Sequence, residues 1–167
     1  MLSARNIENY AINFDKDVRY INKEDYIREK QRTNIEKGDV LLTIVGTIGR
    51  VSIVEQTQKF TIQRSVALLK PILISSRYLM YYLSSSPFSN KILIDNSKGS
   101  AQKGIYLSTL KSINIPITNL KEQNVITQGY NSHSLCPPTS LGHSSSPMID
   151  ISRSIYHQIN GSSLFSL

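Results

Sequence analysis

The stretch GDVLLTIVGTIGRVSIV, from Gly38 to Val54, contains two short runs of aliphatic and β-branched residues. The first run is Val40–Val45, the second is Arg50–Val54, and the Gly-bounded segment Gly46–Gly49 separates them. β-Branched residues favour strands, and glycine supplies the backbone conformations that tight turns need. The stretch therefore predicts a β-hairpin.

Further elements are predicted on both sides of this hairpin. Asn22–Gln31 carries acidic and basic residues at helical spacing, with Asn22 as the N-cap, which indicates a short surface helix. The run Ser65–Leu69 ends at Lys70-Pro71 and is expected to pair with the same sheet. A helix capped by Ser75 or Ser76 is expected next, and it has one apolar stripe: Tyr78, Leu79, Tyr82 and Leu83.

The segment that follows is more irregular. Pro87 is expected to start a short turn with Phe88, Ile92 and Leu93 as its apolar face, and the polar segment Asp95–Gly104 is expected to form a loop. Ser108 is expected to cap a helical turn over Thr109–Ser112, before an edge strand over Ile113–Ile117 that contains Pro116. Together these elements predict an α+β fold, a mixed and largely antiparallel twisted sheet covered by short helices, with a disordered C-terminal tail.

The composition limits the class of protein. A chain of 167 residues with 40% hydrophobic residues has room for one domain with a packed core. No apolar run approaches the ~20 residues of a membrane helix, no secretory signal is visible and there is one cysteine, so a cytoplasmic setting is expected. The formal net charge of +7 favours binding to a polyanion, of which nucleic acid is the commonest large one.

Charge is distributed unevenly along the chain. After Gln123 the only charged residues are Asp150 and Arg153, and Ser132–Pro147 is rich in serine, proline and glycine. We therefore predict a recognition domain over residues 1–123 and a low-charge tail over residues 124–167, with the boundary between Gln123 and Gly129. The tail is expected to be disordered, with one short amphipathic piece from Met148 to Ile159.

No catalytic or cofactor motif is visible. The acidic residues follow helical or surface patterns, and Gly46–Gly49 lacks the Lys-Ser/Thr of a phosphate-binding loop, so a tight turn is favoured there. The zinc-ligand types lie far apart in the tail, at His133, Cys136, His143 and His157. The sequence thus predicts neither an enzyme nor a cofactor or metal site.

Basic and amide side chains are the best candidates for function. Lys98, Gln102 and Lys103 lie in one Gly-flanked loop, which combines phosphate donors with an amide that can read adenine. Arg5, Asn6, Arg50 and Arg64 are expected to add to the same DNA-binding face. The alternative for each is an ordinary solvated side chain, and for Arg64 a structural ion pair at the start of a strand.

Five segments, in this order, resemble a target recognition domain of the specificity subunit of type I restriction and modification enzymes. They are ARNIENY (Ala4–Tyr10), GDVLLTIVGTIGRVSIV (Gly38–Val54), QRSVALLKP (Gln63–Pro71), SSRYLMYYLSSSPF (Ser75–Phe88) and SAQKGIYLSTLKSINIPITNLKEQ (Ser100–Gln123). Each motif is weak alone, but their order and spacing are specific.

The resemblance implies a sequence-specific reader of double-stranded DNA without catalysis of its own. Each recognition domain would read one half of a bipartite target. Methyltransferase and restriction subunits would carry out methylation and cleavage with S-adenosylmethionine and ATP. The resemblance also implies that Gly46–Gly49 and Gln63–Pro71 are mainly scaffold, and that the loop around Ser100–Gly104, including Ser100, faces the DNA.

Two departures from the family pattern lead to further expectations. The family domain begins upstream of the position that matches Met1, so its N-terminal part is expected to be missing here. After Gln123 the family continues into a long helix with apolar heptads, whereas Asn124–Leu167 has none. A truncation or reading-frame change near Gln123 would account for this tail.

Two alternatives to a sequence-specific reader remain at this point. One is a non-specific, basic nucleic-acid binder that keeps the fold. The other is an interaction fragment that pairs with a second specificity chain to complete a bipartite reader. Salt-dependent DNA binding without sequence enrichment would indicate the first alternative, and a co-purifying specificity chain would indicate the second.

Overall fold

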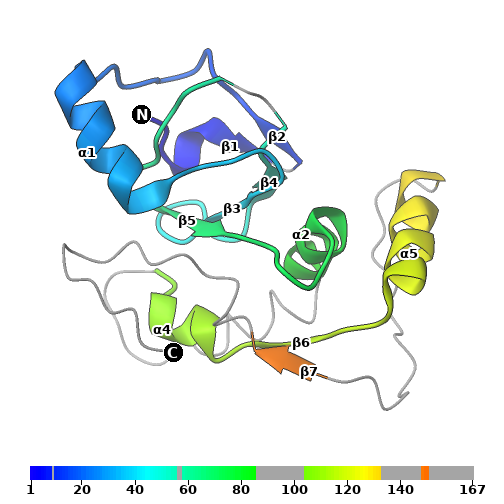
Figure 1. Cartoon of the computed structure of the whole chain (residues 1–167). Helices are drawn as coiled ribbons and strands as arrows, with labels where there is room; N and C mark the ends of the chain where they lie inside the picture. Colours follow the sequence, from blue (N-terminus) through cyan, green and yellow to red (C-terminus); the bar gives the residue numbers. More distant parts are fainter. Residues whose placement is uncertain (9, 56–57, 86–103, 133–147, 151–167) are drawn as a thin grey trace.

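The computed structural model describes residues 1–8, 10–55, 58–85, 104–132 and 148–150 (Figure 1). Helices and antiparallel strands occur together, which confirms the α+β class. In chain order the elements are η1 (Ala4–Asn6), β1 (Ile7–Glu8), β2 (Ala11–Ile12), α1 (Lys23–Thr33), β3 (Val40–Thr43), β4 (Val51–Ile53), β5 (Val66–Leu69), α2 (Ser76–Ser84), α4 (Leu107–Lys111), β6 (Asn114–Pro116), α5 (Leu120–Ser132) and β7 (Met148–Asp150).

The predicted hairpin and third strand form an antiparallel sheet of strand order β4-β3-β5. Leu42 in the central strand lies opposite Val51 of β4 and Ala67 of β5. Gly46 and Gly49 in the hairpin turn have φ of +82° and +90°, a region that residues with a Cβ rarely adopt. The tight turn predicted from the glycines is therefore confirmed.

Both faces of this sheet are buried. Val40 and Leu42 of β3 belong to one core cluster, whereas Leu41 between them belongs to the other. Successive side chains of a strand point to opposite faces, so a strand that is covered on both sides is apolar throughout. This explains why the VLLT run of β3 shows no alternation of polar and apolar residues.

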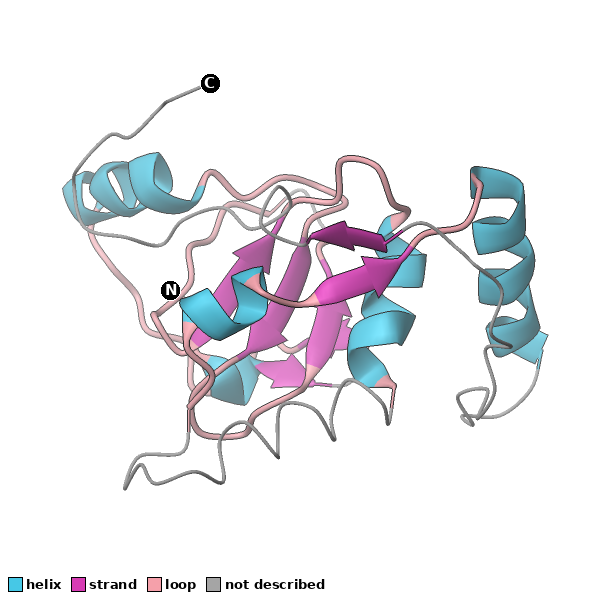
Figure 2. Ribbon diagram, turned by 90° about the horizontal axis from the view of Figure 1, so that it is seen from below, coloured by secondary structure: helices cyan, strands magenta, loops and turns pink. Residues whose placement is uncertain are grey.

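Helix α2 covers the first face of the sheet, and the β6–β7 pair lies next to it (Figure 2). The Ser75 hydroxyl caps α2 by accepting a hydrogen bond from Tyr78 N at 3.1 Å. The Tyr78 hydroxyl donates to Pro116 O at 3.0 Å and the Tyr82 hydroxyl to Asn114 O at 3.1 Å, so two α2 tyrosines hold β6. Burial raises the pKa of both phenols.

The N-terminal segment, rather than a helix, covers the second face. Leu2 and Ile7 pack there with Val54 and Ile62, and all four are nearly inaccessible to solvent. Phe14 and Phe60 add an edge-to-face contact with ring centroids 5.4 Å apart. Among the described residues, an α-helix packs on the first face and the N-terminal segment with η1 on the second, whereas the sequence indicated covering by short helices in general.

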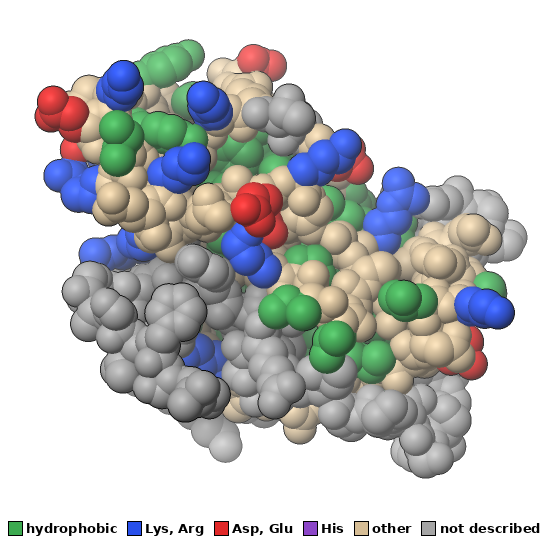
Figure 3. All heavy atoms as spheres, viewed as in Figure 1, with side chains coloured by type: hydrophobic (Ala, Val, Ile, Leu, Met, Phe, Trp, Pro, Cys, Tyr) green, Lys and Arg blue, Asp and Glu red, His purple; other side chains and the backbone are tan. Residues whose placement is uncertain are grey.

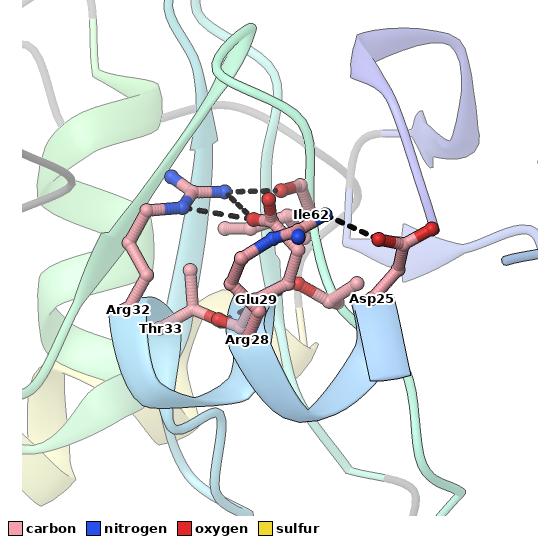
Figure 4. A network of polar contacts seen from close by, with 7 residues as sticks. Asp25, Arg28, Glu29, Arg32, Thr33 and Ile62 are labelled. Carbon is pink, nitrogen blue, oxygen red and sulfur yellow. Dashed lines mark hydrogen bonds and ion pairs between the residues drawn. The ribbon is translucent and has the colours of Figure 1, made fainter. Parts of the chain in front are cut away.

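Helix α1 begins at the predicted cap, Asn22, and ends at Asn34. Asn22 Oδ1 accepts a hydrogen bond from Asp25 N at 2.7 Å, and Asn34 ends the helix in the left-handed conformation. Two further contacts attach α1 to the segment before β5, and Figure 4 shows the one between Arg32 and Ile62. Arg32 Nη2 donates to Ile62 O at 3.0 Å and the Thr33 hydroxyl lies 3.4 Å from that of Thr61, so α1 is held by polar contacts.

The C-terminal elements differ from the sequence predictions in detail. Helix α4 begins at Leu107 with Tyr106 at its N-cap and no side-chain cap, so the prediction that Ser108 caps it is wrong. The residues before it, Ile105 and Tyr106, are already positioned by the hydrogen bond from Ile105 N to Ile44 O. Strand β6 occupies the predicted region and, of the described strands, pairs with β7, which suits Pro116.

Helix α5 passes through the position where the composition changes. Gln123 is 1% exposed, accepts a hydrogen bond from Ser75 N at 2.8 Å and donates one to Thr118 O at 2.8 Å. It thereby attaches α5 to the start of α2. Part of α5 lies within residues 124–167, for which the sequence predicted disorder, and β7 lies at the start of the segment Met148–Ile159 that was expected to be a short amphipathic piece. The division of the chain at Gln123 stays a prediction.

Some predicted features lie outside the described residues, namely the turn after Pro87 and the loop that begins at Asp95. Among the helices that the structure describes, none has the length and apolar character needed to cross a bilayer.

An ion cluster lies where β3 begins and β5 ends. Lys70 Nζ lies 2.9 Å from Glu36 Oε2 and 3.1 Å from Asp39 Oδ2, and the Asp39 side chain is 7% exposed. Burial lowers the pKa of Lys70, but hydrogen bonds and charge attraction from Glu36 and Asp39 outweigh burial, so its pKa lies above the ordinary 10.5. Folding therefore favours the protonated form of Lys70, whereas at Asp39 burial outweighs the same contacts and raises the pKa of the carboxyl.

We expect Lys70→Met to lower the free energy of unfolding by about 2 kcal/mol at neutral pH, because Asp39 keeps its burial and loses its partner. Because the folded pKa is raised, this contribution is complete below pH 10.5 and falls as pH rises through the folded value. Urea unfolding of both proteins from neutral to alkaline pH measures it. A difference that stays constant through the titration of Lys70 would contradict the prediction. Exposed Lys121→Met is the control.

Candidate nucleic-acid interface

Four segments that are distant in sequence meet at the end of the sheet where β3 leads into β4. They are η1, the turn Gly46–Gly49, the residues Gln63–Ser65 and the residue Gly104. We call this region the turn end of the sheet.

Hydrogen bonds between the backbones, and one from a backbone amide to the Ser65 hydroxyl, hold the segments of the turn end together. Ser65 Oγ accepts from Ala4 N at 3.1 Å, which attaches η1 to the start of β5. Ser65 O accepts from Ile44 N at 2.9 Å, and Ile44 O accepts from Ile105 N at 2.8 Å. Gly104 forms a bridge with Val45 just beyond these residues. The arrangement is therefore built by long-range pairing and not by one continuous motif.

Three of the predicted arginines lie at the turn end. Arg5 follows Ala4 and Arg64 precedes Ser65, so the Ala4–Ser65 hydrogen bond brings these two exposed residues to the same region. Arg50 closes the turn on the β4 side, is half-buried, and donates from Nη1 to Ile7 O at 3.4 Å. Arg50 is thus partly committed to the fold, whereas Arg5 and Arg64 lie on the accessible surface.

Arg5 has an acidic neighbour on the surface. Its Nη1 lies 3.5 Å from Asp17 Oδ2, and the two side chains are 77% and 55% exposed. An ion pair this exposed is worth little in water and is screened by salt. The guanidinium therefore remains able to exchange this carboxylate for a phosphate.

The turn itself leaves space in front of the sheet. A Cβ added at Gly46 or Gly49 would meet no atom of the described residues within 4 Å, and Thr47 is exposed between them. Gly49 N donates to Thr43 O at 3.0 Å, so this amide is used to close the turn. A partner can approach the backbone of the turn closely without displacing side chains.

Asn6 does not belong to the interface, and the prediction that it binds DNA is wrong. Its side chain is fully buried. The amide accepts from Ser3 N at 2.8 Å and donates to Asn13 O at 3.1 Å and to Lys16 O. A buried amide whose donors and acceptor are all used is a structural element. Asn6 joins η1 to the loop that follows β2.

Comparison with known proteins gives the family. The model of the type I restriction modification DNA specificity domain matches residues 3–133, most of the chain. The chain belongs to this family. The specificity subunit of the type I restriction enzyme EcoBI from Escherichia coli is 36% identical over 113 residues. The aligned stretch covers 66% of the chain and 23% of that subunit, so the chain spans about a quarter of this relative.

A solved structure from the type I R-M system, described in terms of complex assembly and conformational transition, is also similar to this specificity domain. The two chains are 24% identical, with a TM-score of 0.47 over 59% of this chain and 23% of that one.

Four of the candidate residues, Lys98, Ser100, Gln102 and Lys103, lie outside the described part of the specificity domain. They precede Gly104 in the chain, and Gly104 pairs with Val45 at the turn end. Their role in DNA contact stays a prediction.

Metal chemistry has no support in the described residues of the specificity domain. Within them, no group of three or more His, Cys, Asp or Glu side chains is suitably placed for a metal ion. The histidines and the cysteine of the tail lie outside the described residues.

Sequence reasoning missed a set of exposed residues beside Arg5. Lys16, Arg19 and Tyr20 lie in the loop between β2 and α1, and all three are exposed. The sequence places two cationic residues and one aromatic residue within five positions. The neighbouring Asp15 and Asp17 bring the local net charge to zero, so the segment does not stand out as basic.

Proposed function

We propose that this chain is the DNA-reading module of a type I restriction-modification system. In this role it binds double-stranded DNA and recognises one half of a bipartite target. The observation that carries the proposal is the meeting of Arg5 and Arg64 at one exposed end of the sheet, in a chain of the specificity-domain family. Catalysis would belong to methyltransferase and restriction subunits, so the chain would need no cofactor, and its place of action would be the cytoplasm.

The turn end suggests how DNA would be held. Arginine side chains neutralise phosphates and fix the position of a duplex, whereas contacts to base edges supply sequence information. Arg5 and Arg64 have the exposure that phosphate contacts require. Gln102, in the segment that leads to Gly104, is the proposed reader of an adenine, with Lys98, Ser100 and Lys103 as its neighbours on the DNA side. A second specificity chain would complete the bipartite reader.

Selection from a randomised duplex pool tests this function. The purified full chain, with its folding checked by circular dichroism, is expected to enrich a motif of about three to five base pairs at moderate salt, which is the size of one half-site. Binding without enrichment would favour the non-specific alternative. A folded chain that binds no duplex would contradict the proposal.

Arg5→Ala and Arg64→Ala are each expected to weaken binding to all duplexes by about three- to tenfold near 0.1 M salt. Each variant should also make the slope of log K against log salt less negative by about 0.9, because one phosphate contact is lost. Fluorescence anisotropy over a salt series measures both quantities. Lys121→Ala removes an exposed charge from α5, which Figure 1 shows at the far side from α1 and η1, and should change neither. Unchanged slopes in both arginine variants would remove these residues from the interface.

Gln102→Ala is expected to relax the preference at one base position by about 1 to 3 kcal/mol and to leave the salt slope unchanged. Lys103→Ala should instead weaken every duplex to a similar degree. Competition between the selected duplex and its single-base variants distinguishes the two. Equal losses on every sequence for both variants would refute base reading by Gln102.

A further inference from the structure

We propose that the loop between β2 and α1, residues 13–20, is a second contact to the DNA backbone. Lys16 and Arg19 would bind phosphates, and the ring of Tyr20 would pack against the adjoining sugar–phosphate chain. This inference rests on the proposed DNA-binding function and adds a contact element that lies outside the turn end. Its basis is the combination of a fixed backbone with exposed cationic and aromatic side chains.

The first half of the loop is fixed by buried and local hydrogen bonds. Asn6, which is fully buried, donates to Asn13 O at 3.1 Å and to Lys16 O. Asn13 Oδ1 in turn accepts from Asp15 N at 3.0 Å and from Lys16 N at 3.2 Å. The backbone that carries Lys16 is therefore positioned from the interior of the protein.

The second half is fixed by the chain terminus and by the core. The Met1 ammonium donates to Arg19 O at 2.7 Å, and Arg19 N donates to Met1 O at 3.2 Å. Phe14 and Val18 pack against the core cluster that covers the second face of the sheet. A binding loop with a preset backbone loses little conformational entropy when a partner docks.

The side chains that this backbone presents have the chemistry of a polyanion site. Lys16 and Arg19 are exposed, and Tyr20 is 91% exposed, the highest value among the large hydrophobic side chains that the structure describes. A tyrosine ring is readily buried in a protein, because its hydroxyl can still form a hydrogen bond at the edge of the core. An almost fully exposed ring on a fixed backbone therefore points to an external partner. Its hydroxyl can donate to a phosphate oxygen while its ring covers a sugar.

The loop is continuous with the turn end. Asp17 lies 3.5 Å from Arg5, so Lys16 and Arg19 extend the basic surface that begins at Arg5. The loop also carries Asp15 and Asp17, whose charges balance those of Lys16 and Arg19, so Arg5 beside the loop supplies the net positive charge of this surface. In Figure 3, Lys and Arg side chains are spread over the upper part of the molecule, around α1 and the N-terminal segment. One duplex can therefore engage both elements.

The test compares two variants of the full chain with a charge-matched control. The probe is the duplex selected above, or a random-sequence duplex of equal length, and binding is measured by anisotropy across a salt series. Lys16→Ala/Arg19→Ala is expected to weaken binding about tenfold or more and to reduce the salt slope by about 1.8, for two phosphates. Tyr20→Ala should weaken binding about three- to tenfold with an unchanged slope, and Tyr20→Phe should restore part of the loss.

The control, Arg77→Ala/Lys121→Ala, removes the same charge from exposed positions in α2 and α5 and should keep the wild-type slope. Thermal unfolding of each variant excludes loss of fold as the cause, since the three loop side chains are exposed. If the wild-type chain binds DNA and the loop variants bind equally well, the inference is overturned and the proposed function stands. If the wild-type chain binds no duplex, both fall. Equal weakening in the control would show a general charge effect and would also overturn the inference.

Discussion

Replacing Asn6 by alanine is expected to lower the free energy of unfolding by about 3 kcal/mol. The substitution leaves Asn13 O and Lys16 O without their buried donor and Ser3 N without its acceptor at 2.8 Å. Each unsatisfied buried polar group costs about 1 to 3 kcal/mol, and the loop can recover part of the loss by admitting water. Urea unfolding followed by circular dichroism measures the change.

The neighbouring residue provides the control for this prediction. Arg5→Ala changes an exposed side chain in the same 3₁₀ helix and should alter stability by less than about 0.5 kcal/mol while weakening DNA binding. In Asn6 variants, the loss of DNA binding should match the fraction of protein that is unfolded. An Asn6→Ala protein of wild-type stability with weakened binding would reverse the structural assignment of Asn6.

Leu79→Ala is expected to cost about 3 to 4 kcal/mol of stability. Leu79 lies at the centre of α2, is fully buried, and belongs to the core cluster that joins this helix to the sheet. Removing a leucine side chain from a packed core forfeits its transfer free energy and leaves a cavity. Because α2 also carries the tyrosines that hold β6, the midpoint of unfolding should shift for the sheet and helix signals together.

Leu120 offers the matched control for Leu79. It begins α5 and is 62% exposed, so Leu120→Ala should change the free energy of unfolding by no more than about 0.5 kcal/mol. Comparable losses in the two variants would contradict the division between the core and the exposed surface. Calorimetry or urea titration of the two proteins decides between these outcomes.

The Asn6 prediction concerns how the candidate interface is supported. Asn6 is itself buried, yet it fixes the η1 backbone next to Arg5 and the loop that carries Lys16. A binding surface of this kind depends on interior groups that never touch the partner. We therefore expect substitutions of buried residues to lower stability and substitutions of exposed residues to weaken binding, even where the two residues are adjacent in the chain.

Local sequence determined much of this protein. The glycines of the Gly46–Gly49 turn and the aliphatic runs beside it predict the hairpin, and Asn22 and Ser75 predict where two helices begin. These features depend on residues within a few positions of each other, so their physical causes can be seen in the sequence. The order of the motifs was also enough to indicate the family.

Only the tertiary structure decided which polar residues are available for binding. Arg5 and Asn6 are adjacent in sequence, yet one is exposed and the other fully buried, because Asn6 meets the backbone of Asn13 and Lys16. The turn end likewise depends on hydrogen bonds from Ala4 to Ser65 and from Ile105 to Ile44. Composition and periodicity describe one segment at a time, whereas burial and proximity arise when distant segments pack together.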